Sequence, residues 1–167
     1  MTSPAKPVVN IADVELMDRG HGEKFALKWG RIGPLIGAQA LGCALHVVPA
    51  GKRAFPLHAH HANEEMFFIL SGTGEYRFGD KTYPIKAGDM LAAPAGGAEL
   101  AHQIINTGAD EMRYLGFSTM LTPEAVDYPE SGKFAVWSRP HPSGDPRMAG
   151  LRYIGRRETT LDYWEGE

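Results

Sequence analysis

The feature that most constrains this chain is the stretch 58–72, which reads His-Ala-His-His-Ala-Asn-Glu-Glu-Met-Phe-Phe-Ile-Leu-Ser-Gly. His58 and His60 are two residues apart, so on an extended strand both side chains leave the same face. A carboxylate then opens the β-prone run 66–70. Two imidazoles and a carboxylate this close together make a partial site for a divalent metal ion. The spacing differs from the helical H-E-x-x-H pattern, so we expect a site on strands that needs at least one further ligand.

The missing ligand should come from another strand whose side chains face the same interior. His102 is the best candidate, because it opens the run 102–106, in which His102, Ile104 and Asn106 share one face. This run follows residues 88–96, which read as a strand ended by a Pro/Gly turn.

Most of the chain reads as short strands joined by turns, which is typical of an all-β sandwich or barrel. The signal for helices is weak everywhere, and the one candidate helix start is Thr122 followed by Pro123. The predicted strands are 14–17, 25–29, 41–48, 66–70, 75–78, 81–86, 90–93, 100–105 and 112–118.

The chain after Ser118 is rich in Pro, Gly and charge but keeps isolated aromatic residues along its length. A free tail would be polar and poor in aromatics. We therefore expect an extended arm that docks its rings on the barrel or on a partner subunit, with Trp164 as an anchor near the end. The run 66–70 is apolar on both faces, so its outer face needs a cover from the second sheet, the arm or a second subunit. We expect a homodimer.

Length and charge exclude several classes of protein. The chain has 167 residues and a formal net charge of −3, which suits one domain and gives no reason to expect a nucleic-acid or membrane partner. A single cysteine excludes an internal disulfide. The N-terminal residues contain no apolar signal region, and no apolar run is long enough to span a bilayer, so we expect a cytoplasmic protein.

The residues singled out above are similar to the two motifs of the cupin superfamily. The first motif is matched by Gly51, His58, His60, Glu65 and Gly72, and the six residues before Gly72 select Glu65 over its neighbour Glu64. The second motif is matched by Gly88, Pro94, Gly96, His102 and Asn106. Two loops are longer than in the family pattern: six residues separate Gly51 from His58, and five separate Gly96 from His102. Such chains resemble bacterial stand-alone cupins, which are often labelled sugar-phosphate isomerases.

The resemblance implies a double-stranded β-helix, or jelly-roll barrel, formed by a single domain over residues 1–167. Its barrel core would lie at about 26–120, preceded by N-terminal strands in 1–25 and followed by the C-terminal arm 119–167. It also implies a site of three histidines and one glutamate, formed by His58, His60, Glu65 and His102, for one divalent ion such as Zn, Mn, Fe or Ni.

Three functions fit this resemblance, and the ligand set does not choose between them. The first is a metalloenzyme acting like an isomerase on a sugar phosphate or related oxygen-rich substrate, through an enediolate whose charge the metal stabilises. The second is a metal-dependent dioxygenase. The third is a non-catalytic cupin that binds or senses a small ligand.

Other residues are weaker candidates for a role at the site. An isomerase needs a general base, for which Glu99 and Tyr76 are the candidates. A sugar phosphate also needs cations, and Lys52 and Arg53 precede His58 in the sequence. The remaining histidines are expected at the surface or in loops: His21, His46, His61 and His141.

Overall fold

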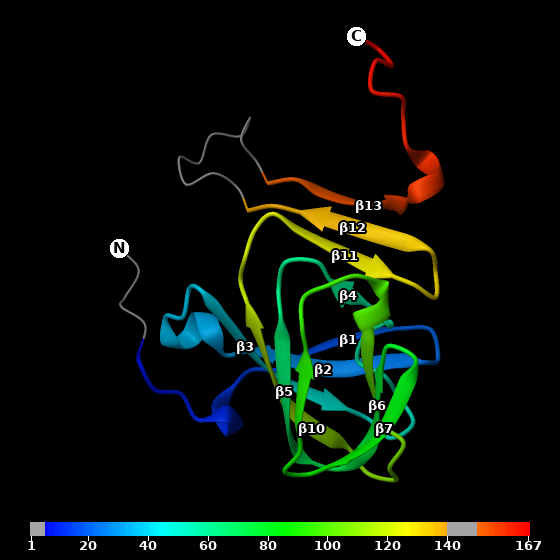
Figure 1. Cartoon of the computed structure of the whole chain (residues 1–167). Coiled ribbons are helices and arrows are strands. Elements are labelled where there is room, and N and C mark those ends of the chain that lie inside the picture. The colour runs from blue at the N-terminus through cyan, green and yellow to red at the C-terminus, as the bar shows by residue number, and fades with distance from the viewer. Residues whose placement is uncertain (1–5, 140–149) are drawn as a thin grey trace.

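A computed structural model describes residues 6–139 and 150–167 of the chain. The described chain is built mainly of strands, which form two sheets of a barrel and a third sheet above it (Figure 1). This confirms the prediction of an all-β, jelly-roll architecture. The only helices in the described residues are short 3-10 turns, among them η1 (Ile11–Asp13), η2 (Gly33–Ile36), η3 (Ala98–Leu100) and η5 (Arg157–Thr159). None of the helices in these ranges is long and apolar enough to cross a membrane.

The larger barrel sheet has six antiparallel strands in the order β1-β2-β3-β10-β5-β8. Their bounds are β1 (Met17–His21), β2 (Phe25–Arg31), β3 (Leu41–Val48), β10 (Met112–Thr119), β5 (Glu65–Ser71) and β8 (Met90–Ala93). The smaller barrel sheet has the order β7-β6-β9, with β7 (Lys81–Lys86), β6 (Thr73–Phe78) and β9 (His102–Ile105).

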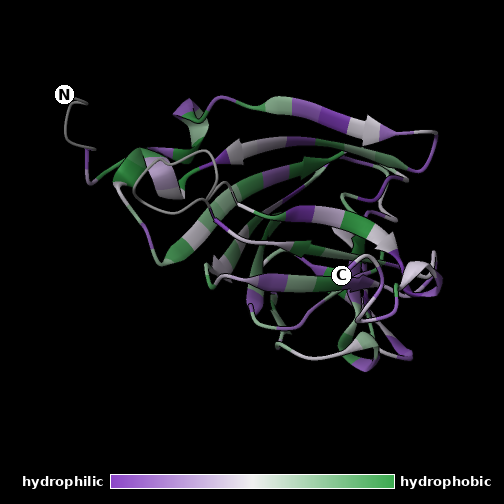
Figure 2. Cartoon of the chain, turned by 90° about the horizontal axis from the view of Figure 1, so that it is seen from above, coloured by the Kyte–Doolittle hydropathy of each residue, from purple (hydrophilic) through white to green (hydrophobic). Residues whose placement is uncertain are grey.

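The main core lies between these two sheets, because alternate residues of each strand point inward. On β5, Phe67 and Ile69 are buried, whereas Met66 on the opposite face is 50% exposed. The buried side chains of Phe67 and Ile69 pack with Tyr76 and Ile104 from the smaller sheet in one hydrophobic cluster. Figure 2, coloured by hydropathy, shows hydrophobic and hydrophilic residues following one another along the strands.

The outer face of the larger sheet is covered in part by the N-terminal segment of the same chain. Val14 and Ile32 form a second cluster with Leu45, and Leu70 and Leu115 pack against it. This source of cover was not among those predicted from the sequence. The predicted homodimer stays a prediction, and the exposed Met66 lies on the face that it would use.

The C-terminal segment is more regular than the predicted extended arm. It contributes three strands to a four-stranded sheet in the order β13-β12-β11-β4. The bounds are β13 (Arg152–Arg156), β12 (Lys133–Trp137), β11 (Glu124–Tyr128) and β4 (Ala59–His60). The predicted helix start at Thr122 is wrong, because residues 124–128 pair on both sides as a strand, with β4 and with β12.

The aromatic residues of this segment divide into two groups. Tyr128, Phe134 and Trp137 are half-buried, so these rings do dock. Tyr163 and Trp164 are 83% and 73% exposed, so Trp164 does not anchor the segment on its own chain as predicted. Figure 1 shows the reason, since the chain leaves the barrel after β13. Docking of Trp164 on a partner subunit stays a prediction.

Deleting residues 160–167 should therefore leave the melting temperature unchanged, because the large side chains there bury little surface. Deleting residues 122–167 should instead lower the melting temperature sharply or abolish soluble expression, because β11 pairs with β4. Thermal unfolding followed by circular dichroism checks both. Equal stability of the two truncated chains would contradict this account of the segment.

Candidate metal centre

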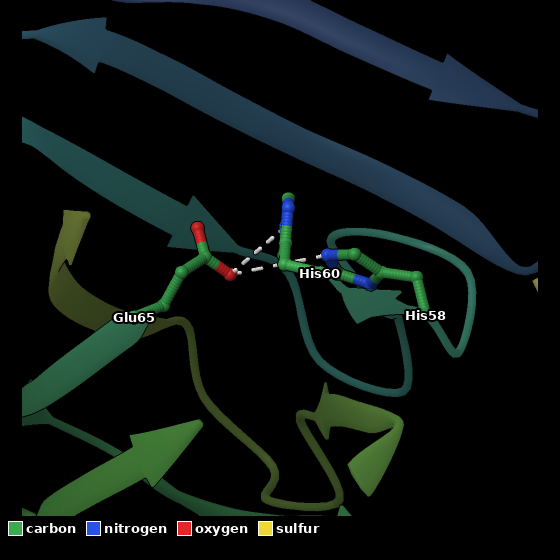
Figure 3. A group of neighbouring side chains, drawn as sticks. All are labelled: His58, His60 and Glu65. Atoms are coloured by element: carbon green, nitrogen blue, oxygen red, sulfur yellow. Dashed lines mark ion pairs between the residues drawn. The ribbon is translucent and has the colours of Figure 1, made fainter. Parts of the chain in front are cut away.

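Three of the predicted ligands form a compact group at one end of the barrel. His58, His60 and Glu65 each offer a potential ligand atom, and these atoms all lie within 4.8 Å of one another. The Oε2 atom of Glu65 is 3.4 Å from His60 Nε2 and 3.9 Å from His58 Nε2. Figure 3 shows the Glu65 carboxylate directed toward both imidazoles.

His102 reaches the same carboxylate from the opposite sheet. Its Nε2 atom is 3.0 Å from Glu65 Oε2, and its side chain is only 4% exposed. Its ring centroid is 4.6 Å from that of His58. The structure thus brings the three predicted histidine ligands together around one oxygen of the fourth predicted ligand, Glu65. That they bind a metal stays a prediction.

Short strands and backbone bridges hold these side chains in place. The backbones of His58 and His102 exchange two hydrogen bonds, of 3.2 and 2.8 Å, so the two loops meet as a small antiparallel bridge. The carbonyl of Pro56 also lies 2.8 Å from His58 Nδ1, which fixes that ring and leaves its Nε2 directed toward Glu65. Glu65 is the first residue of β5, which lies between β10 and β8 in the larger sheet.

Burial and charge oppose each other at Glu65. Burial alone would raise the pKa of its carboxyl, but hydrogen bonds from His102 and His60 hold that pKa well below the usual range. Burial and the neighbouring His102 lower the pKa of His58 to about 4. Burial also opposes protonation of His60, but the carboxylates of Glu65 and Glu124 raise its pKa above the usual value.

The donor set fits a divalent cation. Three imidazoles face one anionic oxygen, and imidazole nitrogen with carboxylate oxygen suits Zn, Fe, Mn or Ni. The Nδ1 atoms of His60 and His102 are buried without a hydrogen-bond partner in the described chain. A cation at the facing Nε2 atoms would compensate the buried carboxylate more completely than the imidazoles do alone.

A cavity of about 580 Å³ opens onto these four side chains. Its walls are formed by the inward faces of β2, β3, β10 and β5, which carry Trp29, His46, Tyr114 and Phe67. A volume of this size is typical of sites for small organic molecules.

His46 lies on the wall of this cavity, and the prediction that it is a surface or loop residue is wrong. It is 6% exposed and stacks on Tyr114 at 4.6 Å, its direct partner across β3 and β10. Gly116 makes room for it, because a Cβ atom there would lie 2.8 Å from His46 Cε1. Burial lowers the pKa of His46 to about 4. The signal was its alternation with Ala44 and Val48, which puts all three on the inner face.

The other histidines follow the prediction where the structure describes them. His21 and His61 are exposed, and His61 Nε2 lies 2.9 Å from a carboxylate oxygen of the buried Asp127. His141 lies outside the described residues.

The structure does not bring the two predicted general bases to the cavity. Glu99 is exposed and its carboxylate accepts a hydrogen bond from the Gly97 N–H in its own loop. Tyr76 is buried in the core, where its hydroxyl donates to the Ala92 carbonyl at 2.8 Å. Burial raises the pKa of Tyr76 far above its usual range. A role for Glu99 or Tyr76 as a general base stays a prediction.

The predicted cations also lie elsewhere. Lys52 donates to the Glu23 carbonyl at 2.5 Å, and neither Lys52 nor Arg53 lines the cavity. Two arginines that were not predicted from the sequence, Arg19 on β1 and Arg31 on β2, line it instead.

Glu124 is a further residue that sequence reasoning missed. It is 1% exposed, and its carboxylate accepts hydrogen bonds from three consecutive backbone N–H groups, those of His61, Ala62 and Asn63, at 3.0–3.2 Å. The Asn63 side chain donates to it as well. Its Oε2 atom lies 3.8 Å from His60 Nδ1. Glu124 therefore supports both the turn between β4 and β5 and one imidazole, although no local motif marks it.

Comparisons with known proteins agree with this geometry. Residues 44–118 match the family model described as a cupin domain. Over 65 residues the chain is 35% identical to an oxalate-binding protein of Thermotoga maritima, covering 39% of this chain and 51% of that protein. The match thus spans about half the length of the curated relatives found.

Two solved structures resemble nearly the whole chain. One is a protein of Acidithiobacillus ferrooxidans that is provisionally named a sugar phosphate isomerase. It has a TM-score of 0.74 and 22% identity, and the match covers 94% of this chain and 96% of that chain. The other is a cupin-superfamily sugar phosphate isomerase of Silicibacter pomeroyi, with a TM-score of 0.74, 18% identity and coverage of 94% and 98%. At these identities the likeness concerns the fold.

Replacing both His58 and His60 by alanine should abolish binding of a divalent ion, because half of the ligand set is lost. Elemental analysis and titration with zinc measure the loss. The matched control is the His21→Ala/His61→Ala double variant, which removes two exposed imidazoles and should keep full metal content. Unchanged metal content in the first variant would contradict the assignment.

Stability of the metal-free protein should fall as the pH drops from about 6.5 to 4. The pKa of His46 is lowered by burial from 6.5 to about 4. Between these pH values the unfolded state binds a proton at His46 that the folded state does not bind, so protonation favours unfolding. A shift of this size corresponds to about 3 kcal/mol for His46 at pH 4. The His46→Phe variant should lose less unfolding free energy than the wild type over the same window, as measured by denaturant titration. Parallel pH profiles for the two proteins would refute this assignment.

Proposed function

This chain is a member of the cupin superfamily, with its cupin domain at residues 44–118, and we propose that it is a metal-dependent enzyme acting on a small oxygen-rich molecule. The observation that carries the proposal is the convergence of three imidazoles on the Glu65 carboxylate at the end of a cavity. A bound divalent ion would supply positive charge next to a substrate oxygen on which negative charge develops.

The proposed reaction is isomerase-like and moves a proton between adjacent carbons of a hydroxy-ketone. Within the described chain, His46 is the cavity-lining imidazole outside the proposed ligand set. Burial lowers its pKa to about 4, so the ring is unprotonated at physiological pH and one of its nitrogens can accept a proton. His46 would take the proton from the carbon that carries the hydroxyl and return it to the former carbonyl carbon, while the hydroxyl proton moves to the former carbonyl oxygen.

The walls of the cavity assist this step in two ways. Stacking on Tyr114 and the edge contact with Phe55 fix the orientation of the His46 ring, so the imidazole is held ready beside the substrate. Aromatic walls also limit water around the reacting carbon. The names of the two Acidithiobacillus and Silicibacter neighbours are in line with an isomerase, and they support this choice by analogy of fold.

Binding without turnover is the second candidate. It is favoured by the relative from Thermotoga maritima, which is named as an oxalate-binding protein and is 35% identical to this chain over 65 residues. In that case the same four side chains would hold an ion that binds a small acid, and His46 would serve only as part of the wall.

Proton exchange distinguishes the two candidates. The metal-loaded protein should exchange the carbon-bound proton of a suitable hydroxy-ketone for deuterium in D₂O, followed by NMR over a panel of such compounds. The His46→Gln variant should slow this exchange by about 10²-fold or more while keeping its metal content, because the proton acceptor is lost. Cys43→Ser, which also alters a residue lining the cavity, is the matched control and should keep the rate.

Two results would contradict the proposed isomerase. Binding of the panel without any proton exchange would favour the binding protein. Consumption of oxygen by the Fe(II)-loaded protein with the same compounds would favour a dioxygenase.

A further inference from the structure

The cavity that reaches the four proposed ligands is lined mainly by apolar and aromatic side chains. The aromatic residues come from four strands and one loop, and they are Trp29, Phe55, Phe67, Tyr114, Phe117 and Trp137. The strand register explains this, because Trp29 pairs with His46, His46 with Tyr114, and Gly116 with Phe67 across the inner face of the sheet.

Two uncharged polar side chains of this lining are already hydrogen-bonded within the chain. Gln103 already uses both ends of its amide, donating to the Phe55 carbonyl at 2.8 Å and accepting from Arg77 at 2.9 Å. The Ser118 hydroxyl donates to the Thr119 carbonyl at 2.7 Å. A sugar would place several hydroxyl groups against this wall, and each one without a partner would cost binding energy.

Two arginines flank Trp29 on the side of the cavity formed by β1 and β2. The guanidinium carbon of Arg19 lies 4.5 Å from the Trp29 ring centroid, and that of Arg31 lies 6.0 Å from it. Both line the cavity, and neither has an ion pair with another residue in the described ranges. A guanidinium held against an aromatic ring keeps its edge free to bind a carboxylate or phosphate with two parallel hydrogen bonds.

We propose that the natural ligand is an organic anion that carries its hydroxy-ketone oxygens on an apolar, ring-like body, rather than a polyhydroxylated sugar phosphate. Its anionic group would bind to Arg19 and Arg31, its body would pack against Trp29, Tyr114 and Phe67, and its oxygen donors would face the proposed metal ligands. The last part rests on the proposed function and assigns a substrate class to the same site. The aromatic wall and the arginine pair stand independently of the metal.

Four probes separate the contributions of the body and of the charge. They are 1-naphthoate, 1-naphthyl phosphate, the neutral 1-naphthylmethanol and ribose 5-phosphate, each titrated calorimetrically into the full chain with and without zinc. Both naphthyl anions should bind at least about tenfold more tightly than the neutral naphthyl alcohol and ribose 5-phosphate. Whichever of the two naphthyl anions binds more tightly identifies the natural anionic group as a carboxylate or a phosphate.

Matched variants locate the anionic end. Arg19→Gln/Arg31→Gln should reduce the affinity of the naphthyl anions to that of the neutral alcohol, in zinc-free protein as well. Lys28→Gln removes a positive charge from the exposed outer face of β2, the strand that carries Arg31, and should leave the affinity of the naphthyl anions unchanged. The single variant Arg31→Gln should also reduce the affinity of the naphthyl anions, and it changes the protein less than the double variant does. Circular dichroism confirms that each variant is folded.

Either of two results would overturn the proposal. Tighter binding of ribose 5-phosphate than of either naphthyl anion would show that the cavity prefers a polyol. A preference for anions that survives loss of both arginines would place the anionic group elsewhere. Loss of metal binding in the His58→Ala/His60→Ala variant is a separate measurement, so a failure of the metal assignment is distinguishable from a failure of the ligand assignment.

Discussion

The structure depends on a carboxylate, four-fifths buried, that is placed among imidazoles. Glu65 lies where burial would disfavour its charge, and the nearby rings of His58, His60 and His102 compensate for it. Removing such partners would leave an unpaired charge in the interior, which costs several kcal/mol. This constraint links three separate parts of the chain, because the rings come from the loop before β4, from β4 and from β9, while the carboxylate opens β5. A divalent cation would satisfy all four groups together.

A second buried carboxylate extends this dependence to the C-terminal strands. Glu124 lies outside the residues that match the cupin family model, yet it satisfies the backbone N–H groups of the turn 61–63 and lies beside His60. Tyr128 and Trp137 from the same sheet come within 6.2 and 6.4 Å of His58 and His60, measured between ring centroids. The C-terminal sheet thus completes one wall around the proposed metal ligands, and the cavity uses both parts of the chain.

Local periodicity and motif spacing were sufficient to predict several strands and the meeting of the proposed ligands. Strands 41–48, 81–86 and 90–93 match the observed bounds, and the four ligands meet because alternation on strands fixes which face a side chain occupies. Properties set by contacts between distant segments could not be read in this way. Thr122 and Pro123 carry a helix signal, but pairing with β4 and β12 makes the following residues a strand. The positions of Glu124, Arg19 and Arg31 likewise depend on strand order, and Trp164 is exposed although its chemistry favours burial.

Anomalous X-ray diffraction from crystals of the zinc-loaded chain tests most directly whether one divalent ion joins the two histidine motifs. We expect one strong anomalous peak, with the His58, His60 and His102 nitrogens and a Glu65 oxygen all within about 2.0–2.3 Å. A peak at another pair, such as His61 and Asp127, or zinc-loaded crystals in which His102 and Glu65 point away from the ion, would contradict it.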